Sequence, residues 1–421
     1  MKIITVTKED RILNGKITLP ASKSISNRLL MIRALRGKKF RITNLSKADD
    51  TILLQHLLKE VEGNGKRRAV FELDTRNAGT VMRFLAAYLT MKPGKWILTG
   101  SERMRQRPIG IQVEALRKLG ADIEYLSKLG YPPLMIKGRS LKGGEVDVDA
   151  SVSSQFISAI LMIAPYLPGG LTLRMSGLPV SFPYIEMTLG LMKEYGIMLR
   201  REKNRIRVEP GTYSGKDYRV EADWSAAAFW YEAAALSEQA CLELPALEQN
   251  SLQGDAILAL VYQNFGVQTE YTPNGVILTQ VPRKSKGFYF DFTGYPDIAP
   301  AVISTCAGLG IRGRFEGLQS LRIKETDRLE ALQREYEKLG VNVEAADVTE
   351  LLKAFEFAPS HLQPGPGLVM ETYGDHRMAM TFAPLALKLG SIRIKNPDVV
   401  AKSYPGFWED LRKTGFVLSE Q

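Results

Sequence analysis

An internal repeat constrains the fold of this chain more than any other feature of its sequence. Six times, a small or polar cluster opens an apolar segment, and a second, amphipathic segment then ends at a glycine. The six copies run from Ser24 to Gly63, Asn77 to Gly120, Ser153 to Gly196, Asp223 to Gly266, Asp297 to Gly340 and Asp375 to Gly415. Subtracting the residue numbers gives separations of 39, 43, 43, 43, 43 and 40 residues. Such regular spacing indicates six copies of one supersecondary unit.

Each copy is predicted to fold as a helix, a strand, a second helix and two more strands. In the second to fifth copies an apolar residue precedes the final glycine, as in Leu119-Gly120, and glycine at this place is the expected left-handed cap of a helix. Short strand-like runs follow, such as Ala121 to Leu126. In the fourth copy, Pro273-Asn274-Gly275 predicts a turn between two strands. The sequence therefore predicts an α/β protein.

The chain is long enough for two groups of three copies. Its 421 residues exceed the usual limit of about 250 to 300 residues for a single core. A break is expected near Val220-Glu221-Ala222, just before the fourth copy, and Leu19-Pro20-Ala21 is the matching crossing near the front. Two crossings would form a hinge, and ligands favour clefts between domains.

The first helix of each copy is predicted to be buried, because it is apolar nearly all round, as in Phe156 to Ile163. Its N-terminus is the polar end. There, free N–H groups and the helix macrodipole, equivalent to about half a positive charge, favour a bound anion. We expect the six N-termini to face one cavity.

The charge balance suits an anionic partner. The net charge is +10 and the pI is about 9.3, which would fit nucleic acid, an anionic membrane or a small phosphorylated substrate. The longest basic cluster, Arg33 to Arg41, has no run of interleaved aromatic residues for stacking on bases, so we expect no nucleic acid. The most apolar segment, Phe156 to Leu167, falls short of the roughly 18 residues of a membrane span. Residues 2–11 are too charged for a signal peptide, which predicts a cytoplasmic protein.

Neither the cysteines nor the histidines form a recognisable metal or disulfide pattern. Cys241 and Cys306 both lie in apolar surroundings, so we expect two buried thiols and no disulfide framework. The three histidines, His56, His361 and His376, have no ligand partners at metal-binding spacing. The sequence predicts no metal.

The stretch from Arg322 to Arg328 carries five ionisable side chains in seven residues, directly before an apolar-periodic helix. One interpretation is a solvated helix start, with Thr326 as the N-cap and Asp327 in the first turn. The other rests on the i,i+4 spacing of Lys324 and Arg328. Two cations at this spacing could converge on one anion beside the titratable carboxylate that lies between them.

Other polar clusters lie at the starts of the predicted helices, and each also has an ordinary structural interpretation. Ser153-Ser154 could be a helix cap, the segment from Asn77 to Thr80 a turn, and His376 a structural histidine. Lone Arg107 or Lys402 would by default lie on the surface. Their joint pattern is more informative than any one of them.

That joint pattern resembles the 5-enolpyruvylshikimate-3-phosphate synthases, also called 3-phosphoshikimate 1-carboxyvinyltransferases, over nearly the whole chain. The two most specific segments are Asn77-Ala78-Gly79-Thr80-Val81-Met82-Arg83 and Arg322-Ile323-Lys324-Glu325-Thr326-Asp327-Arg328. They are supported by Lys23-Ser24-Ile25-Ser26-Asn27-Arg28, Ser153-Ser154-Gln155-Phe156 and Asp375-His376-Arg377-Met378-Ala379-Met380. The resemblance implies two similar lobes, each of three βαβαββ-type units, in the inside-out α/β barrel of the enolpyruvyl transferases. One lobe would hold residues 21–221 and the other residues 1–20 with 222–421, with a hinge near 19–22 and 220–223.

The resemblance also implies a reaction and its binding residues. The enolpyruvyl group of phosphoenolpyruvate would pass to the 5-hydroxyl of shikimate 3-phosphate, with release of phosphate and without a cofactor, in aromatic amino-acid biosynthesis. By position, the phosphoenolpyruvate contacts would be Lys23, Asn77, Gly79, Arg107, Gln155, Arg328, Arg377 and Lys402. The shikimate 3-phosphate contacts would be Ser24, Arg28, Ser153, Ser154, Gln155, Ser181, Tyr184, Asp297 and Lys324.

The chemistry requires one acid and one base that exchange roles. Addition protonates the methylene carbon while the 5-hydroxyl loses its proton, and elimination then removes a proton from that carbon as phosphate leaves. The catalytic candidates are Asp297 near the hydroxyl and Glu325 near the methylene, with Lys23 assisting the hydroxyl or the leaving phosphate. Family precedent implies a monomer.

Three positions depart from the family's pattern. Ala21 stands where glycine is usual, Phe84 where proline is common after Arg83, and Ser320 where asparagine is usual. The first two bear on sensitivity to glyphosate, the inhibitor of this family, although Gly79 keeps space for it. A water could replace the substrate hydrogen bond that Ser320 loses.

Two alternatives remain at this point. The UDP-N-acetylglucosamine enolpyruvyl transferases share the fold and the chemistry, but they carry a loop cysteine and a lysine-asparagine pair near the front, where this chain has Lys23-Ser24. A basic RNA-binding protein on the same repeat fold would bind RNA in a salt-sensitive way and release no phosphate.

Overall fold

The computed structural model describes residues 2–64, 69–283, 286–341, 343–349, 352–357, 362–365 and 367–420, so His361 lies outside the described residues. The chain forms two compact units. Lobe A is Lys23–Val220, and lobe B combines Met1–Ser22 with Glu221–Gln421.

Lobe A contains two four-stranded sheets built on the same plan. In each, the first two strands are parallel and the remaining pairs are antiparallel. A parallel pair needs a crossover helix and an antiparallel pair needs only a turn, which is the order of a βαβαββ unit. One sheet has the order β4 (Val70–Asp74), β5 (Gly94–Thr99), β7 (Leu134–Gly138), β6 (Asp122–Tyr125), and the other β8 (Gly144–Asp149), β9 (Leu171–Ser176), β11 (Arg205–Val208), β10 (Leu199–Glu202).

The first copy is smaller than the prediction. It consists of α1 (Lys23–Arg36), β3 (Ile42–Thr43) and α2 (Asp49–Asn64), and β3 pairs only with β12 (Tyr218–Arg219). The predicted closing strands are absent from the described part of this copy, because only five residues separate α2 from β4. The predicted end of the second helix at Gly63 is also wrong, because α2 includes Gly63 and ends at Asn64.

Lobe B contains three four-stranded sheets, and the N-terminal strands complete two of them. β2 is the first strand of the fourth copy's sheet, and β1 lies between the two long strands of the sixth. The first residues of the chain therefore fold with its second half. The sheet orders are β2 (Ile12–Lys16), β13 (Gln239–Pro245), β15 (Gly275–Gln280), β14 (Val267–Thr272); β16 (Gly287–Asp291), β17 (Arg312–Glu316), β19 (Leu352–Phe357), β18 (Val343–Thr349); and β20 (Val369–Met370), β21 (Ser391–Lys395), β1 (Ile3–Thr7), β22 (Val417–Glu420).

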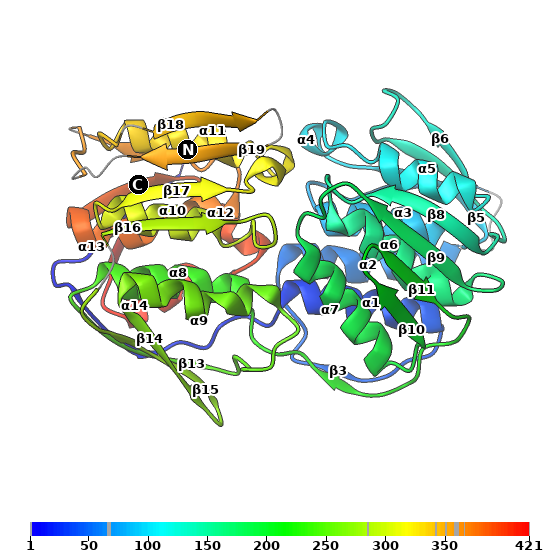
Figure 1. The fold of residues 1–421 in the computed structure, drawn as a ribbon, viewed down its shortest axis with the longest axis horizontal. Coiled ribbons are helices and arrows are strands. Elements are labelled where there is room, and N and C mark those ends of the chain that lie inside the picture. The colour runs from blue at the N-terminus through cyan, green and yellow to red at the C-terminus, as the bar shows by residue number, and fades with distance from the viewer. Residues whose placement is uncertain are drawn as a thin grey trace. The chain divides into compact units, whose positions relative to one another are not determined.

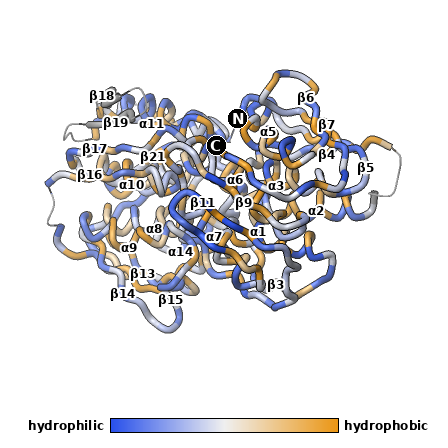
Figure 2. The backbone as a smooth tube through the Cα atoms, turned by 45° about the vertical axis from the view of Figure 1, so that its right-hand side comes forward, coloured by the Kyte–Doolittle hydropathy of each residue, from blue (hydrophilic) through white to orange (hydrophobic). Residues whose placement is uncertain are grey.

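Three buried helices pack together inside each lobe, as the apolar pattern predicted. In lobe A they are α1, α3 (Gly79–Leu89) and α6 (Ser154–Ile163); in lobe B they are α8 (Trp224–Leu236), α10 (Ala299–Gly308) and α12 (His376–Phe382). In Figure 1, α8 lies between the sheet of β13 to β15 and the sheet of β16 to β19. Figure 2 shows the hydropathy of the residues along α1, α3, α6, α8 and α10.

The second helices of the copies are more exposed and less regular. They are α5 (Gly110–Lys118), α7 (Phe182–Glu194), α11 (Arg328–Glu337) and α14 (Phe407–Lys413). In the fourth copy the second helix is broken into η2 (Gly254–Ile257), α9 (Leu258–Val261) and η3 (Tyr262–Phe265). Short helices join the remaining elements: α4 (Glu102–Arg105), η1 (Ala164–Tyr166), η4 (Gln319–Ile323), η5 (Ala383–Leu385), α13 (Ala386–Leu389) and η6 (Pro397–Lys402).

In the second to sixth copies, the second helix ends at a glycine that has the predicted left-handed conformation. The φ angles are +93° at Gly120, +83° at Gly196, +79° at Gly266, +74° at Gly340 and +85° at Gly415. A side chain at this conformation is strained, which explains why glycine recurs at the end of each copy.

The two connections between the lobes pair with each other where they leave lobe B. Ala21 and Ala222 form an antiparallel bridge. The N–H of Ser22 donates to the carbonyl of Glu221 at 2.9 Å, and the N–H of Asp223 donates to the carbonyl of Pro20 at 2.9 Å. The two strands of the crossing are therefore joined by backbone hydrogen bonds.

One cysteine contradicts the sequence prediction. Cys306 is buried, and burial raises the pKa of its thiol well above the usual value. Cys241 is exposed, because the side chains of β13 alternate and Ala240 and Leu242 occupy the buried face. Within the described ranges, no helix is long and apolar enough to span a membrane, and no group of three or more His, Cys, Asp or Glu residues could hold a metal ion.

A buried carboxyl group lies in the core of lobe B. Glu232, on α8, is fully buried, and burial raises its pKa well above the usual value; the hydroxyl of Ser304 offsets this only in part. The raised pKa means that folding favours the protonated form of this side chain. Folding then becomes less favourable as the pH rises above the ordinary carboxyl pKa.

We predict that Glu232→Gln raises the melting temperature at pH 8 and has little effect near pH 4. Each kcal/mol added to the free energy of unfolding should raise the melting temperature by about 2–4 °C. Glutamine matches the shape of the protonated acid but needs no proton. Thermal unfolding measured by circular dichroism at both pH values checks this, with the exposed Glu238→Gln as the control. An equal shift at both pH values, or a lower melting temperature at pH 8, would contradict it.

Candidate active site

In lobe B, acidic residues mark the N-termini of the three buried helices. Asp223 caps α8 by accepting a hydrogen bond from the N–H of Ser225 at 2.8 Å, and Asp375 caps α12 by accepting one from the N–H of Arg377 at 2.9 Å. α10 has no side-chain cap, and the carboxylate of Asp297, which lies two residues before it, binds cations instead.

Arg328 connects these acidic residues. Its side chain is only 1% exposed at the start of α11. Nε donates to Asp375 at 2.7 Å, Nη2 donates to Glu325 at 2.9 Å, and Nη1 lies 3.4 Å from Asp297. Burial lowers the pKa of Arg328, but the three carboxylates outweigh burial and raise it. One buried cation thus holds carboxylates from three segments of the chain.

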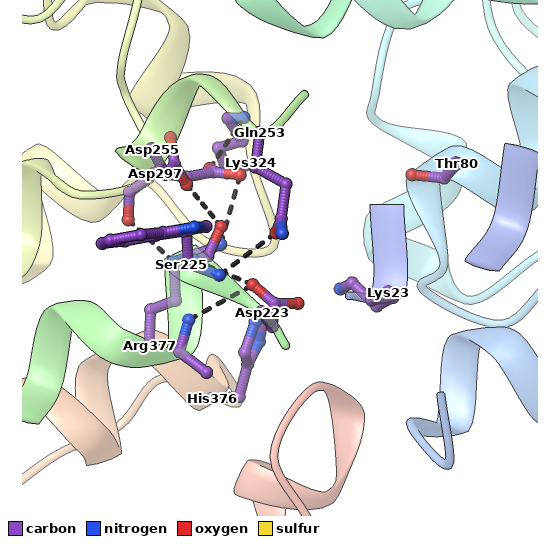
Figure 3. A network of polar contacts seen from close by, with 12 residues as sticks. Lys23, Thr80, Asp223, Ser225, Gln253, Asp255, Asp297, Lys324, His376 and Arg377 are labelled. Atoms are coloured by element: carbon purple, nitrogen blue, oxygen red, sulfur yellow. Dashed lines mark hydrogen bonds and ion pairs between the residues drawn. The ribbon is translucent and has the colours of Figure 1, made fainter. Parts of the chain in front are cut away.

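Other cations surround the same carboxylates. Asp297 lies 3.2 Å from Lys324 Nζ and 3.2 Å from Arg377 Nη2, and Glu325 lies 3.2 Å from Lys402 Nζ. Figure 3 shows part of this network, with Lys324 and Arg377 directed toward Asp297. The structure therefore joins all the residues predicted for this lobe, namely Asp297, Lys324, Glu325, Arg328, Arg377 and Lys402.

The start of α11 differs from the prediction by one residue. Asp327 is the N-cap and accepts hydrogen bonds from the N–H groups of Leu329 at 3.1 Å and Glu330 at 3.2 Å, so the expectation that Thr326 caps this helix was wrong. The backbone is extended at Lys324 and still non-helical at Asp327. Helical geometry therefore begins only at the arginine of the network.

In lobe A, Arg107 packs against the N-terminus of α3. Its Nη1 donates to the carbonyl of Asn77 at 3.3 Å and to Asn77 Oδ1 at 3.4 Å. A Cβ atom on Gly79 would lie 2.6 Å from Arg107 Nη2, closer than real Cβ atoms approach. Glycine at the first residue of α3 therefore allows the buried guanidinium to lie against the backbone.

The other N-termini of lobe A also carry polar contacts. Lys23 Nζ, at the start of α1, lies 3.1 Å from Asp50. Ser153 caps α6, since its hydroxyl accepts a hydrogen bond from the N–H of Gln155 at 3.3 Å. The side-chain amide of Gln155 in turn donates to the hydroxyl of Thr80 at 3.4 Å, which links α6 to α3. The neighbouring Ser154 is buried at the start of α6.

Arg28 is held more firmly than a lone surface arginine. Its guanidinium is buried and donates to the hydroxyl of Thr188 at 2.7 Å and to the carbonyls of Ser24 and Tyr184 at 3.0 Å each. A further bond reaches the hydroxyl of Ser158 at 3.4 Å. These bonds use four of the five N–H groups of a guanidinium. Burial lowers its pKa to about 10.

Ser181 has a strained backbone. Its φ angle is +54° with ψ +37°, in the left-handed region, and its side chain makes no capping hydrogen bond to α7. A non-glycine residue in this conformation costs about 1–3 kcal/mol and persists where its surroundings enforce it, often at ligand sites. The role of Ser181 in ligand binding stays a prediction.

The family model described as EPSP synthase (3-phosphoshikimate 1-carboxyvinyltransferase) matches residues 7–411. The chain belongs to the EPSP synthase family. A 3-phosphoshikimate 1-carboxyvinyltransferase of Bacteroides fragilis is 48% identical over 405 residues, with 96% of each chain covered. One from Sulfurovum sp. is 37% identical over 432 residues, covering 98% of this chain and 99% of the relative.

Solved structures of the family share the fold. An EPSP synthase from Acinetobacter baumannii superimposes with a TM-score of 0.77 at 23% identity, and the alignment covers all of both chains. The predicted fold class, two lobes in the inside-out α/β arrangement of the EPSP synthases, is therefore confirmed. The shortened first copy is a local difference from the predicted repeat.

The three departures from the family pattern have distinct surroundings. Ala21 lies in the paired crossing and is nearly buried. The ring of Phe84 is buried on α3, with its centroid 5.5 Å from the guanidinium carbon of Arg28, a cation–π distance. The hydroxyl of Ser320 is buried in η4 and has no hydrogen-bond partner among the described residues.

The sequence prediction missed several residues of the two networks. Asp50 and Thr80 contact predicted site residues in lobe A, and Ser225 and Asp255 lie beside Asp297 in lobe B. Thr80 lies within the Asn77–Arg83 motif, and Ser225 lies in the polar cluster that opens the fourth copy, so the motif and the repeat were the available signals for these two residues. Asp50 and Asp255 belong to neither.

We predict that Arg328→Met lowers the free energy of unfolding by about 3–5 kcal/mol at pH 7, because it leaves buried carboxylates without their cation. Arg334→Met is the matched control: Arg334 lies on the same helix and is paired with Glu330, but it is exposed, and its loss should cost about 0–1 kcal/mol. Urea unfolding of both variants checks this. Equal losses would show that the buried network contributes no more than a surface ion pair.

Proposed function

We propose that this protein transfers the enolpyruvyl group of phosphoenolpyruvate to the 5-hydroxyl of shikimate 3-phosphate and releases phosphate. The observation that carries the proposal is the lobe B network, in which a buried arginine holds two candidate catalytic carboxylates among lysines and a second arginine. The family of the chain carries this activity in its name. The two alternative functions, a UDP-N-acetylglucosamine enolpyruvyl transferase and an RNA-binding protein, are not favoured.

The anionic substrates explain the number of cations. Each substrate brings one phosphate and one carboxylate, and planar arginine forks bind such groups through two parallel hydrogen bonds. The proposed phosphoenolpyruvate contacts are Lys23, Asn77, Gly79, Arg107, Gln155, Arg328, Arg377 and Lys402. The proposed shikimate 3-phosphate contacts are Ser24, Arg28, Ser153, Ser154, Gln155, Ser181, Tyr184, Asp297 and Lys324. Both sets draw on the two lobes.

The proton transfers are assigned to the two carboxylates of lobe B. In the addition, the 5-hydroxyl oxygen bonds to C2 of phosphoenolpyruvate and passes its proton to Asp297, while Glu325 protonates the methylene carbon. In the elimination, Glu325 takes a proton back from that carbon as the bond to phosphate breaks, and Lys23 assists the leaving group. The contacts support this division: Asp297 lies beside Lys324, and Glu325 beside Arg328 and Lys402.

The two lobes are proposed to close over the substrates. The proposed lobes are residues 21–221 and residues 1–20 with 222–421, with the hinge near 19–22 and 220–223. The paired crossing at Ala21 and Ala222 supports this, because two adjacent strands can bend together. Closure would exclude water and complete the site. We further propose a cytoplasmic monomer that binds no nucleic acid.

The direct test supplies both substrates and measures inorganic phosphate. We expect release that depends on both, and Glu325→Gln should reduce turnover by about a hundredfold or more while leaving shikimate 3-phosphate binding nearly intact. Absence of release under conditions in which an established synthase turns over would contradict the proposed function. Equal loss of binding in Glu325→Gln would make this residue a charge-balancing group instead.

We predict that Gly79→Ala raises the KM for phosphoenolpyruvate by about tenfold or more, because the added Cβ would displace Arg107. The KM for shikimate 3-phosphate should change much less. Gly63→Ala is the control, since it is also helical but has open space around it. Steady-state kinetics of the two variants checks this, and an unchanged KM for phosphoenolpyruvate in Gly79→Ala would contradict the assignment of Arg107.

A further inference from the structure

A second buried carboxylate lies behind Asp297 in lobe B. Asp255, in η2, is only 2% exposed, and the hydroxyl of Ser225 donates a short hydrogen bond to its Oδ2. Figure 3 shows Ser225, Asp255 and Asp297 close together in one polar network. Neither residue belongs to the proposed substrate contacts.

The start of α8 does not need Asp255 as a cap. Asp223 already caps the helix, and the side chain of Gln253 accepts a hydrogen bond from the N–H of Trp224 at 3.1 Å and donates to the carbonyl of Ala222 at 2.7 Å. The backbone groups at this helix end are thus bonded by other side chains. Asp255 itself lies in the first turn of η2, and a buried carboxylate is costly unless it is paired or hydrogen-bonded.

Three charged side chains and one hydroxyl group affect the pKa of Asp255. Its pKa is raised to about 6, first by burial and then by the negative charge of Asp297; Asp223 adds to the rise, while the Ser225 hydroxyl and Arg377 oppose it. Asp223 belongs to α8, Arg377 to α12, and Asp297 to the segment before α10. The charge of Asp297 therefore acts on Asp255, and by the same interaction an ionised Asp255 acts on Asp297.

Asp297 needs such a neighbour if it is to act as a base. Three cations lie within 3.4 Å of its carboxylate oxygens, namely Lys324, Arg328 and Arg377. Cations at this distance favour the ionised form and so make a carboxylate a weak base. A general base works best when its affinity for a proton suits the working pH.

We propose that Asp255 is a positioning residue whose negative charge, fixed by the hydrogen bond from Ser225, offsets the cations around Asp297 and keeps Asp297 basic. This inference rests on the proposed function, in which Asp297 takes the proton of the substrate hydroxyl. Asp255 itself touches no reacting atom. It acts only through the electrostatic field at Asp297.

The test compares Asp255→Asn with the wild-type enzyme from pH 5.5 to 9, using phosphate release from both substrates. Asparagine keeps the shape but removes the charge, so kcat should fall about five- to tenfold, and the acidic limb of the kcat profile should move to lower pH because Asp297 becomes a weaker base. Both KM values should stay within about twofold. An unmoved profile, or raised KM values with unchanged kcat, would overturn the proposal.

Two variants of Ser225 complete the test. Ser225→Ala removes the hydrogen bond to Asp255, makes that carboxyl easier to protonate and should move the profile in the same direction by a smaller amount. Ser225→Thr keeps a hydroxyl and should retain the wild-type profile. If Asp255→Asn does not fold, this pair decides the question, and identical profiles for the two would overturn the proposal. An inactive wild-type protein would instead count against the proposed function.

Discussion

The burial of Arg328 among three carboxylates is the interaction on which the rest of lobe B depends. A buried cation is tolerated only when paired, and Asp375, Glu325 and Asp297 together outweigh its desolvation. These carboxylates would in turn be costly to bury without further cations, which Lys324, Arg377 and Lys402 supply. The network therefore fixes the ends of α10, α11 and α12 relative to one another before any substrate binds.

The repeat explains how one chain builds such a network. Each copy brings a buried helix with a polar N-terminus and a second helix whose start lies nearby, so residues far apart in sequence meet at one end of the lobe. In lobe A, Gln155 stands at the repeat position of Arg377, and a glycine at the start of α3 gives room to Arg107. The shared geometry leaves the side chains at these positions variable, which lets each copy contribute a different group.

Much of the fold followed from the sequence, because the signals were physical and repeated. Apolar segments predicted the buried helices, and five of the six final glycines have the left-handed backbone that only glycine adopts without strain. The prediction was wrong for the first copy, because the five residues between α2 and β4 are too few for two closing strands. Cys241 failed because burial in a strand depends on which face a residue occupies, and the surrounding composition does not report that face.

Part of the candidate site could also be predicted from the sequence. The charged motifs identified the six cationic and acidic residues that the structure joins in lobe B. The supporting residues were not visible, because Asp255 gains its role from burial and from its neighbours in space, neither of which a lone aspartate in a broken helix reveals. The predicted cap, Thr326, was wrong by one residue, because threonine and aspartate are both common N-caps and the sequence does not distinguish them.

In the proposed reaction, residues of both lobes bind the anionic substrates, so the lobes are expected to close when the substrates bind. Small-angle X-ray scattering of the protein in solution, alone and with shikimate 3-phosphate and phosphoenolpyruvate together, tests this most directly. A smaller radius of gyration with both substrates is the predicted result. A profile that does not change at saturating substrate would contradict the account.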